Sequence, residues 1–125
     1  MHSFALRVYY EDTDLAGIVY YANYLKFIER ARSEWLRDLG VDQAGLKADQ
    51  GVVFAVRRIE ADYLRPARHD DLLTVTSTFV EHSGARLVLS QSVLRGDETL
   101  FTALVTLVCL DRDGRARRVP DIFAA

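Results

Sequence analysis

The second half of the chain alternates with a period of two, and this pattern constrains the fold more than any other feature of the sequence. Apolar and polar residues alternate over residues 52–64, 72–82, 85–95 and 99–111, as in strands that bury one face. The connections between these segments are short, which favours antiparallel neighbours. The pattern therefore predicts four long strands joined in an antiparallel meander.

A helical period precedes these strands. Apolar side chains recur at three- and four-residue intervals from Leu25 to Leu39, and Gly40 follows as a terminating residue. Residues 3–10 favour one further strand, and residues 41–50 have only weak helical character. The sequence thus predicts an α+β fold in which one long central helix packs against a curved antiparallel sheet of about five strands.

Length and composition restrict the class of protein. The 125 residues, half of them apolar, fit a single globular domain over 1–125. A net charge of −2 gives no general attraction to nucleic acid or acidic membranes, and no apolar run is long enough to insert in a membrane. The single cysteine, Cys109, and an N-terminus without a signal-peptide pattern predict a cytoplasmic location.

The last long strand carries apolar residues on both faces. Leu100, Leu104 and Val108 share one face, while the alternate positions hold Phe101 and other apolar residues. Such a strand is either covered on both sides or part of a subunit interface. Because one helix cannot cover both sides of a sheet, we expect a homo-oligomer, at least a dimer.

Three carboxylates stand immediately before the helix, and three interpretations compete for them: Glu11, Asp12 and Asp14. In the first interpretation they cap the helix, because carboxylates are favourable near the positive end of a helix and Asp is a common N-cap residue. A calcium loop has a similar opening, but Ala16 and Asn23 occupy its fifth and twelfth positions, so no metal is expected. The third interpretation is catalytic, because a carboxylate beside a helix N-terminus combines a base or nucleophile with N–H groups aimed at a carbonyl.

The motif around these carboxylates resembles that of a known family. VYYEDTDLAGIVYYANYLKFIERARSEWL, residues 8–36, is similar to the signature of the 4-hydroxybenzoyl-CoA thioesterase class of hotdog-fold proteins, most closely the acyl-CoA thioesterases associated with the bacterial Tol-Pal system. VRRIEADYLRPARHDDLLTV, residues 56–75, is similar to a second block of that subgroup. The resemblance implies hydrolysis of an acyl-CoA thioester to a carboxylic acid and free CoA, with no metal or redox cofactor.

The resemblance also implies roles for individual residues. Asp14 matches the catalytic carboxylate, as a nucleophile or as the general base for water, and the backbone N–H of Tyr21 matches the donor that polarises the thioester carbonyl. Many members of the subgroup have histidine where this chain has Tyr21, and a tyrosine cannot act as an imidazole acid or base. The expected substrate-binding residues are Gly17, Ile18, Arg58 and Arg86, with Arg86 near the nucleotide end of the substrate.

The family resemblance further implies a sheet that continues between subunits, active sites between those subunits, and a dimer or a homotetramer. The substrate is an acyl-CoA or an acyl group on acyl carrier protein, and its chain length stays open. Two other functions also stay open. One is a hydratase or dehydratase on the same fold, which normally needs a histidine that the acidic motif lacks. The other is a non-catalytic partner that binds acyl-CoA or an acyl carrier.

Overall fold

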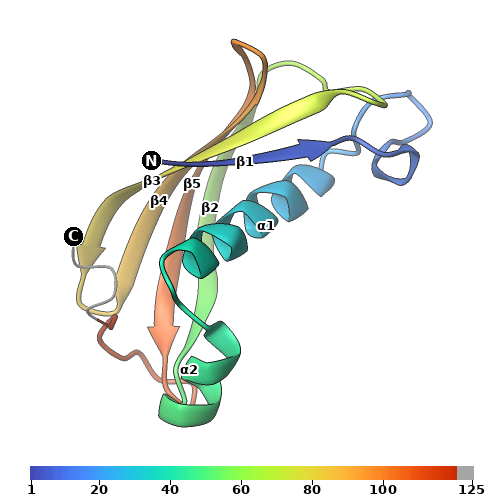
Figure 1. The fold of residues 1–125 in the computed structure, drawn as a ribbon. Helices are drawn as coiled ribbons and strands as arrows, with labels where there is room; N and C mark the ends of the chain where they lie inside the picture. Colours follow the sequence, from blue (N-terminus) through green and yellow to red (C-terminus); the bar gives the residue numbers. More distant parts are fainter. Residues whose placement is uncertain (121–125) are drawn as a thin grey trace.

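The computed structural model describes residues 1–120, and over these residues the predicted α+β fold with a five-stranded antiparallel sheet is confirmed (Figure 1). A short 3-10 helix at Tyr10–Asp12 follows the first strand. The other elements, in chain order, are β1 (His2–Arg7), α1 (Asn23–Asp38), α2 (Gln43–Gln50), β2 (Val53–Tyr63), β3 (Leu72–Ser83), β4 (Arg86–Arg95) and β5 (Glu98–Leu110).

The strand order corrects the predicted four-strand meander. The order is β1-β3-β4-β5-β2, so only β3, β4 and β5 are consecutive neighbours, and β2 pairs with β5. The N-terminal strand takes the position beside β3, with Phe4 opposite Val75. Residues 64–71 must therefore cross one end of the sheet between β2 and β3. This crossover segment begins where the N–H groups of Leu64 and Arg65 both donate to the carbonyl of Leu100.

Residues 1–120 contain two α-helices where the sequence predicted one, because residues 43–50 form α2. The first helix, α1, has 16 residues and ends in a Schellman motif. The N–H of Gly40, at φ 80°, donates to the carbonyl of Arg37, and the N–H of Val41 donates to that of Leu36. This turn buries Val41 and directs the chain into α2.

The core lies between α1 and the concave face of the sheet (Figure 1). The buried side of α1 consists of Tyr24, Phe27, Ile28 and Ala31. These side chains pack against alternate residues of the strands, among them Val75, Leu89, Phe101 and Val105. The helical period of α1 and the two-residue period of the strands thus direct their apolar sides to the same layer.

One polar cluster interrupts this core. Gln91 on β4 is 1% exposed, and its amide nitrogen donates to the Ile28 carbonyl at 3.0 Å and to the Ser77 hydroxyl at 2.9 Å. Its amide oxygen accepts a hydrogen bond from the Arg32 guanidinium at 3.0 Å. Burial lowers the pKa of Arg32, an effect that the charge of Glu29 opposes. Gln91 therefore joins α1 to the middle of the sheet through polar contacts.

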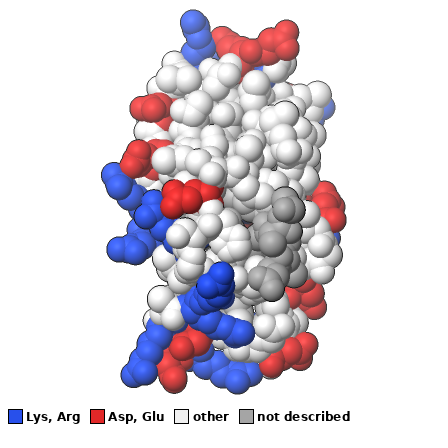
Figure 2. All heavy atoms as spheres, turned by 90° about the vertical axis from the view of Figure 1, so that its left-hand side faces the viewer, with Lys and Arg blue, Asp and Glu red and all other residues white. Residues whose placement is uncertain are grey.

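The opposite face of the sheet carries hydroxyl side chains in its middle. Thr78 and Ser90 are paired and exposed there, next to Leu104, which is 39% exposed. Figure 2 shows the left-hand side of Figure 1, where charged side chains lie mainly around the margin. Strand β5 lies between β4 and β2, and its outward face is not covered by either helix. No helix within residues 1–120 is long and apolar enough to span a membrane.

The buried cluster predicts a large effect of changing Gln91. Gln91→Leu keeps the volume but leaves the Arg32 guanidinium and the Ser77 hydroxyl without their partner, so we expect a loss of about 2–4 kcal/mol in the free energy of unfolding. Chemical denaturation measures the loss, and Ser90→Ala on the exposed face of the same strand serves as the control, with a change within about 0.5 kcal/mol. Equal stability of the two variants would contradict this account of the core.

Candidate active site

Asp14 lies at the tip of a tight loop between the 3-10 helix and α1. The loop is closed by the Asp14 N–H, which donates to the Ile18 carbonyl at 3.0 Å, and by a bridge between Thr13 and Val19. Gly17 has φ 78° and its N–H donates to the Asp14 carbonyl at 3.0 Å, so the turn needs a residue that tolerates positive φ. The Asp14 side chain is exposed, and one of its carboxylate oxygens accepts the Ala16 N–H at 2.9 Å.

The helix-capping interpretation of the three carboxylates is wrong for α1. The N-cap residue is Ala22, no side chain caps the helix, and its first turn contains no acidic residue. Asp12 instead caps the N-terminus of the preceding 3-10 helix, because its carboxylate accepts the Tyr9 N–H at 2.8 Å. The carboxylate of Asp14 therefore has no capping role.

The backbone at the start of α1 is held by the same loop. The Asp12 carbonyl accepts the Tyr20 N–H at 2.9 Å and the Asn23 side-chain amide at 2.9 Å. The Asn23 N–H donates in turn to the Tyr20 carbonyl at 2.8 Å. Within residues 1–120 the N–H of Tyr21 has no acceptor. It is an available donor at the positive end of a helix, where a carbonyl oxygen that gains negative charge is stabilised.

Two tyrosine rings lie together at the beginning of α1. The ring centroids of Tyr20 and Tyr21 are 4.9 Å apart. The pKa of Tyr20 is raised, first by its interaction with the Tyr21 side chain and to a smaller degree by the negative charge of Asp14. The interaction with Asp14 places the carboxylate and the tyrosine pair in one electrostatic environment at the beginning of α1.

The crossover segment, residues 64–71, packs against this loop. Ala67 is fully buried, and its carbonyl accepts the Val19 N–H at 2.9 Å while its own N–H donates to the Tyr24 hydroxyl at 3.0 Å. Ile18 forms a bridge with Arg68 in the same segment. The strand order therefore brings the two sequence blocks that carry the family resemblance into direct contact.

A cavity of about 290 Å³ opens beside Tyr21. It is lined by Ile18, Val19, Tyr21, Tyr24, Tyr63, Leu64, Arg65 and Pro66. Tyr24 stacks on Phe101 at 5.0 Å, and Tyr63 meets Phe101 edge to face at 5.0 Å. The cavity is thus mostly apolar and aromatic, a lining that suits an acyl group.

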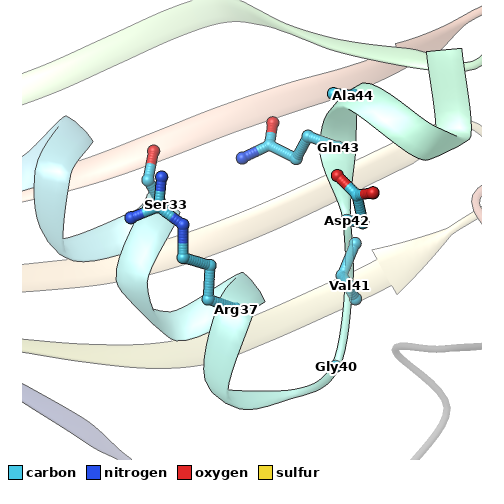
Figure 3. Close-up of a pocket in the computed structure, with 7 residues that line it drawn as sticks. All are labelled: Ser33, Arg37, Gly40, Val41, Asp42, Gln43 and Ala44. Carbon is cyan, nitrogen blue, oxygen red and sulfur yellow. The ribbon is translucent and has the colours of Figure 1, made fainter.

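A larger cavity, of about 470 Å³, lies at the other end of α1, where the chain turns into α2 (Figure 3). Ser33 and Arg37 line it from α1, and Asp42 and Gln43 line it from the beginning of α2. Arg37 is already ion-paired with Glu34. This cavity has charged and amide side chains in its lining and lies at the opposite end of α1 from the Asp14 loop, so the smaller cavity beside Tyr21 is the candidate site.

The structure brings some of the predicted site residues together. Asp14, Gly17, Ile18 and Tyr21 share one loop. Arg58 and Arg86 lie apart from that loop within one chain. Arg58 is on β2, opposite Thr106 of β5, and Arg86 is at the start of β4, opposite Val108 of β5. Arg58 is ion-paired with Glu60 at 2.7 Å, and Arg86 with Glu81 at 3.8 Å.

The sequence-based selection missed residues at the end of β2 and in the crossover segment. Tyr63 and Arg65 line the cavity beside Tyr21, and Arg68 bridges Ile18. Their signal was present in the second block of the resemblance, but the order of the strands was needed to place that block at the site.

Within residues 1–120, no group of three or more His, Cys, Asp or Glu side chains is arranged to hold a metal. Cys109 is buried, and burial raises the pKa of its thiol, which makes it a poor nucleophile.

The comparisons with known proteins place the chain in a family. Residues 8–125 match the family model described as the thioesterase-like superfamily. The chain is 44% identical to the acyl-CoA thioesterase YbgC of Haemophilus influenzae over 87% of this chain and 80% of that protein. It is 43% identical to the acyl-CoA thioester hydrolase YbgC of an Escherichia coli O6:H1 strain over 85% of this chain and 79% of that protein.

A solved structure agrees with these matches. A probable thioesterase from Bartonella henselae has a TM-score of 0.91 and 42% identity, covering 95% of this chain and 98% of that one. The chain therefore belongs to the thioesterase-like superfamily and has its hotdog fold.

An ion-pair network fixes the crossover segment against the sheet. Arg95 donates to the carboxylates of Asp71 at 2.7 Å and Glu98 at 2.6 Å, and Glu98 also pairs with Arg65 at 3.3 Å. Burial acts to raise the pKa of Asp71, but hydrogen bonds from the Arg68 N–H and the Arg95 guanidinium outweigh it and hold that pKa below its usual range. The ionised form of Asp71 therefore stabilises the fold.

This network predicts a pH-dependent effect of Asp71→Asn. Because the folded-state pKa is depressed, the carboxylate's stabilisation is complete above the unfolded-state pKa of about 4 and is lost as the pH falls through the folded-state pKa. We expect the variant to lose about 1–2 kcal/mol of unfolding free energy at pH 7 and the difference to shrink below a pH of about 4. Denaturation at several pH values checks this, with Asp70→Asn in the same turn as the control. A difference that stays constant down to the lowest pH would contradict it.

Proposed function

We propose that the chain hydrolyses acyl-CoA thioesters at the junction of the Asp14 loop and α1. The observation that carries the proposal is the Tyr21 N–H, a donor without an acceptor in the described residues, in the same loop structure as an exposed carboxylate. The acyl group would occupy the cavity of about 290 Å³ beside Tyr21. The family membership and the acyl-CoA thioesterase names of the relatives support the same reaction.

Two routes use the same groups. In the first, a carboxylate oxygen of Asp14 attacks the thioester carbonyl, the C–S bond breaks, and the CoA thiolate leaves; water then hydrolyses the mixed anhydride. In the second, Asp14 accepts a proton from water as the water oxygen attacks the carbonyl carbon, and the C–S bond of the tetrahedral intermediate then breaks to release the CoA thiolate and the carboxylic acid. In both routes the Tyr21 N–H stabilises the oxyanion. Neither route needs an imidazole at position 21, because a thiolate leaves without prior protonation.

The proposal predicts that Asp14→Asn loses at least about 100-fold in turnover, because the amide keeps the size but removes the base or nucleophile. Release of free thiol from short-chain, long-chain and aromatic acyl-CoAs measures the effect. Glu11→Gln is the matched control, since it neutralises an exposed carboxylate of the same acidic segment. Near-normal turnover of Asp14→Asn would contradict the assignment, and binding of acyl-CoA without turnover by the wild type would favour a binding protein.

We also propose that the chain assembles through the edge strand β2. This strand pairs with β5 on one side only, and apolar side chains are exposed along it and just beyond it: Val56 at 46%, Tyr63 at 49% and Leu64 at 54%. A second copy that pairs with this edge would continue the sheet and cover these side chains beside the cavity.

A tetramer, acyl carrier protein as a carrier, a cytoplasmic location and a Tol-Pal association stay predictions from the resemblance.

The assembly predicts that Val56→Lys weakens association, because it places a charge in an apolar contact. Sedimentation velocity of the wild type and the variant over a range of concentrations measures the change. Thr78→Lys, on the open face of the sheet away from this edge, is the control for added charge. A monomeric wild type, or an equal association constant for Val56→Lys, would contradict assembly through β2.

A further inference from the structure

Tyr63, at the end of β2, has no role in the reaction described so far, yet it contacts the start of α1. Its phenol O–H donates to the Tyr21 carbonyl at 3.0 Å, and its ring meets the Tyr21 ring edge to face at 6.2 Å. This is a hydrogen bond from the edge strand to the residue whose N–H serves as the carbonyl donor.

The two peptide units beside the Cα of Tyr21 are held by different hydrogen bonds. The Tyr20 carbonyl and the Tyr21 N–H belong to one planar unit, which is fixed because Tyr20 accepts the Asn23 N–H at 2.8 Å. The Tyr21 carbonyl and the Ala22 N–H belong to the next unit, and the Tyr63 phenol fixes that one. Without the phenol, the second unit has no side-chain hydrogen bond within residues 1–120, so the backbone at Tyr21 loses one of its two restraints.

The Tyr63 ring is itself held in place. It lies 5.6 Å from the ring of Tyr24 and 5.0 Å from that of Phe101, with near-perpendicular planes in the first contact. Tyr24 and Phe101 are both buried, and Tyr24 is fixed by its hydrogen bond from Ala67. The phenol therefore reaches the Tyr21 carbonyl from a side chain that the core already orients.

We propose that Tyr63 is a positioning residue, which fixes the peptide unit after Tyr21 so that the Tyr21 N–H keeps its direction toward the thioester carbonyl. This role rests on the proposed function. It acts on the transition state more than on substrate binding, because the hydrogen bond donated by the Tyr21 N–H strengthens as negative charge develops on the carbonyl oxygen.

Tyr63→Phe tests the role, since it removes only the hydroxyl. We expect kcat to fall about tenfold, the effect of one neutral hydrogen bond, with KM within about twofold of the wild type. Tyr9→Phe is the matched control, because Tyr9 is exposed and does not line the cavity beside Tyr21. If the wild type is active and Tyr63→Phe has the same kcat, the role of Tyr63 is wrong, while the proposed function still stands.

A second measurement separates positioning from a general loss of stability. The infrared band of a carbon-13-labelled thioester carbonyl, bound to Asp14→Asn so that it is not hydrolysed, reports the strength of its hydrogen bond. We expect Tyr63→Phe in that background to shift the band back toward its frequency in free substrate. An unmoved band would overturn the role even if kcat falls. Absence of thiol release from the wild type would instead overturn the proposed function and, with it, this role.

Discussion

The proposed site depends on one contact, the attachment of the crossover segment to the start of α1 through Ala67. Both backbone groups of this buried residue are used, the carbonyl by the Val19 N–H and the N–H by the Tyr24 hydroxyl. The contact joins the Asp14 loop, the helix and the end of the sheet. Because Ala67 is 0% exposed, a larger side chain at this position would have to separate these parts.

The position of this contact follows from the strand order. Had β2 paired with β3, residues 64–71 would form a simple hairpin connection at an edge of the sheet. Because β2 pairs with β5 and β1 pairs with β3, the segment instead crosses the end of the sheet beside the beginning of α1. Arg95 then fixes it through Asp71. The fold thus places a rigid wall of the cavity next to the available Tyr21 N–H, which is the condition for electrostatic stabilisation of an oxyanion.

Local patterns predicted the elements well, because each depends on its own residues. The period of Leu25–Leu39 and Gly40 predicted α1 and its end, and the motif containing Asp14 and Tyr21 predicted the loop before it. The β2–β5 pairing depends on contacts distant in sequence, so periodicity did not predict it, and the hydrogen bond from Tyr63 to Tyr21 depends on that pairing. Arg58 and Arg86 were selected because the phosphates of CoA need cations and, for Arg86, because of the family resemblance. Both lie on strands apart from the Asp14 loop, and their role in substrate binding stays a prediction.

The most direct test of the proposed site is a crystal structure of Asp14→Asn with an intact acyl-CoA. We expect the thioester oxygen to lie within hydrogen-bonding distance of the Tyr21 N–H, about 2.7–3.2 Å from the nitrogen, with the acyl group in the cavity beside Tyr21. The amide that replaces the Asp14 carboxylate should lie next to the carbonyl carbon. An acyl group bound elsewhere, for example in the larger cavity between α1 and α2, with the Tyr21 N–H left to solvent, would contradict the assignment.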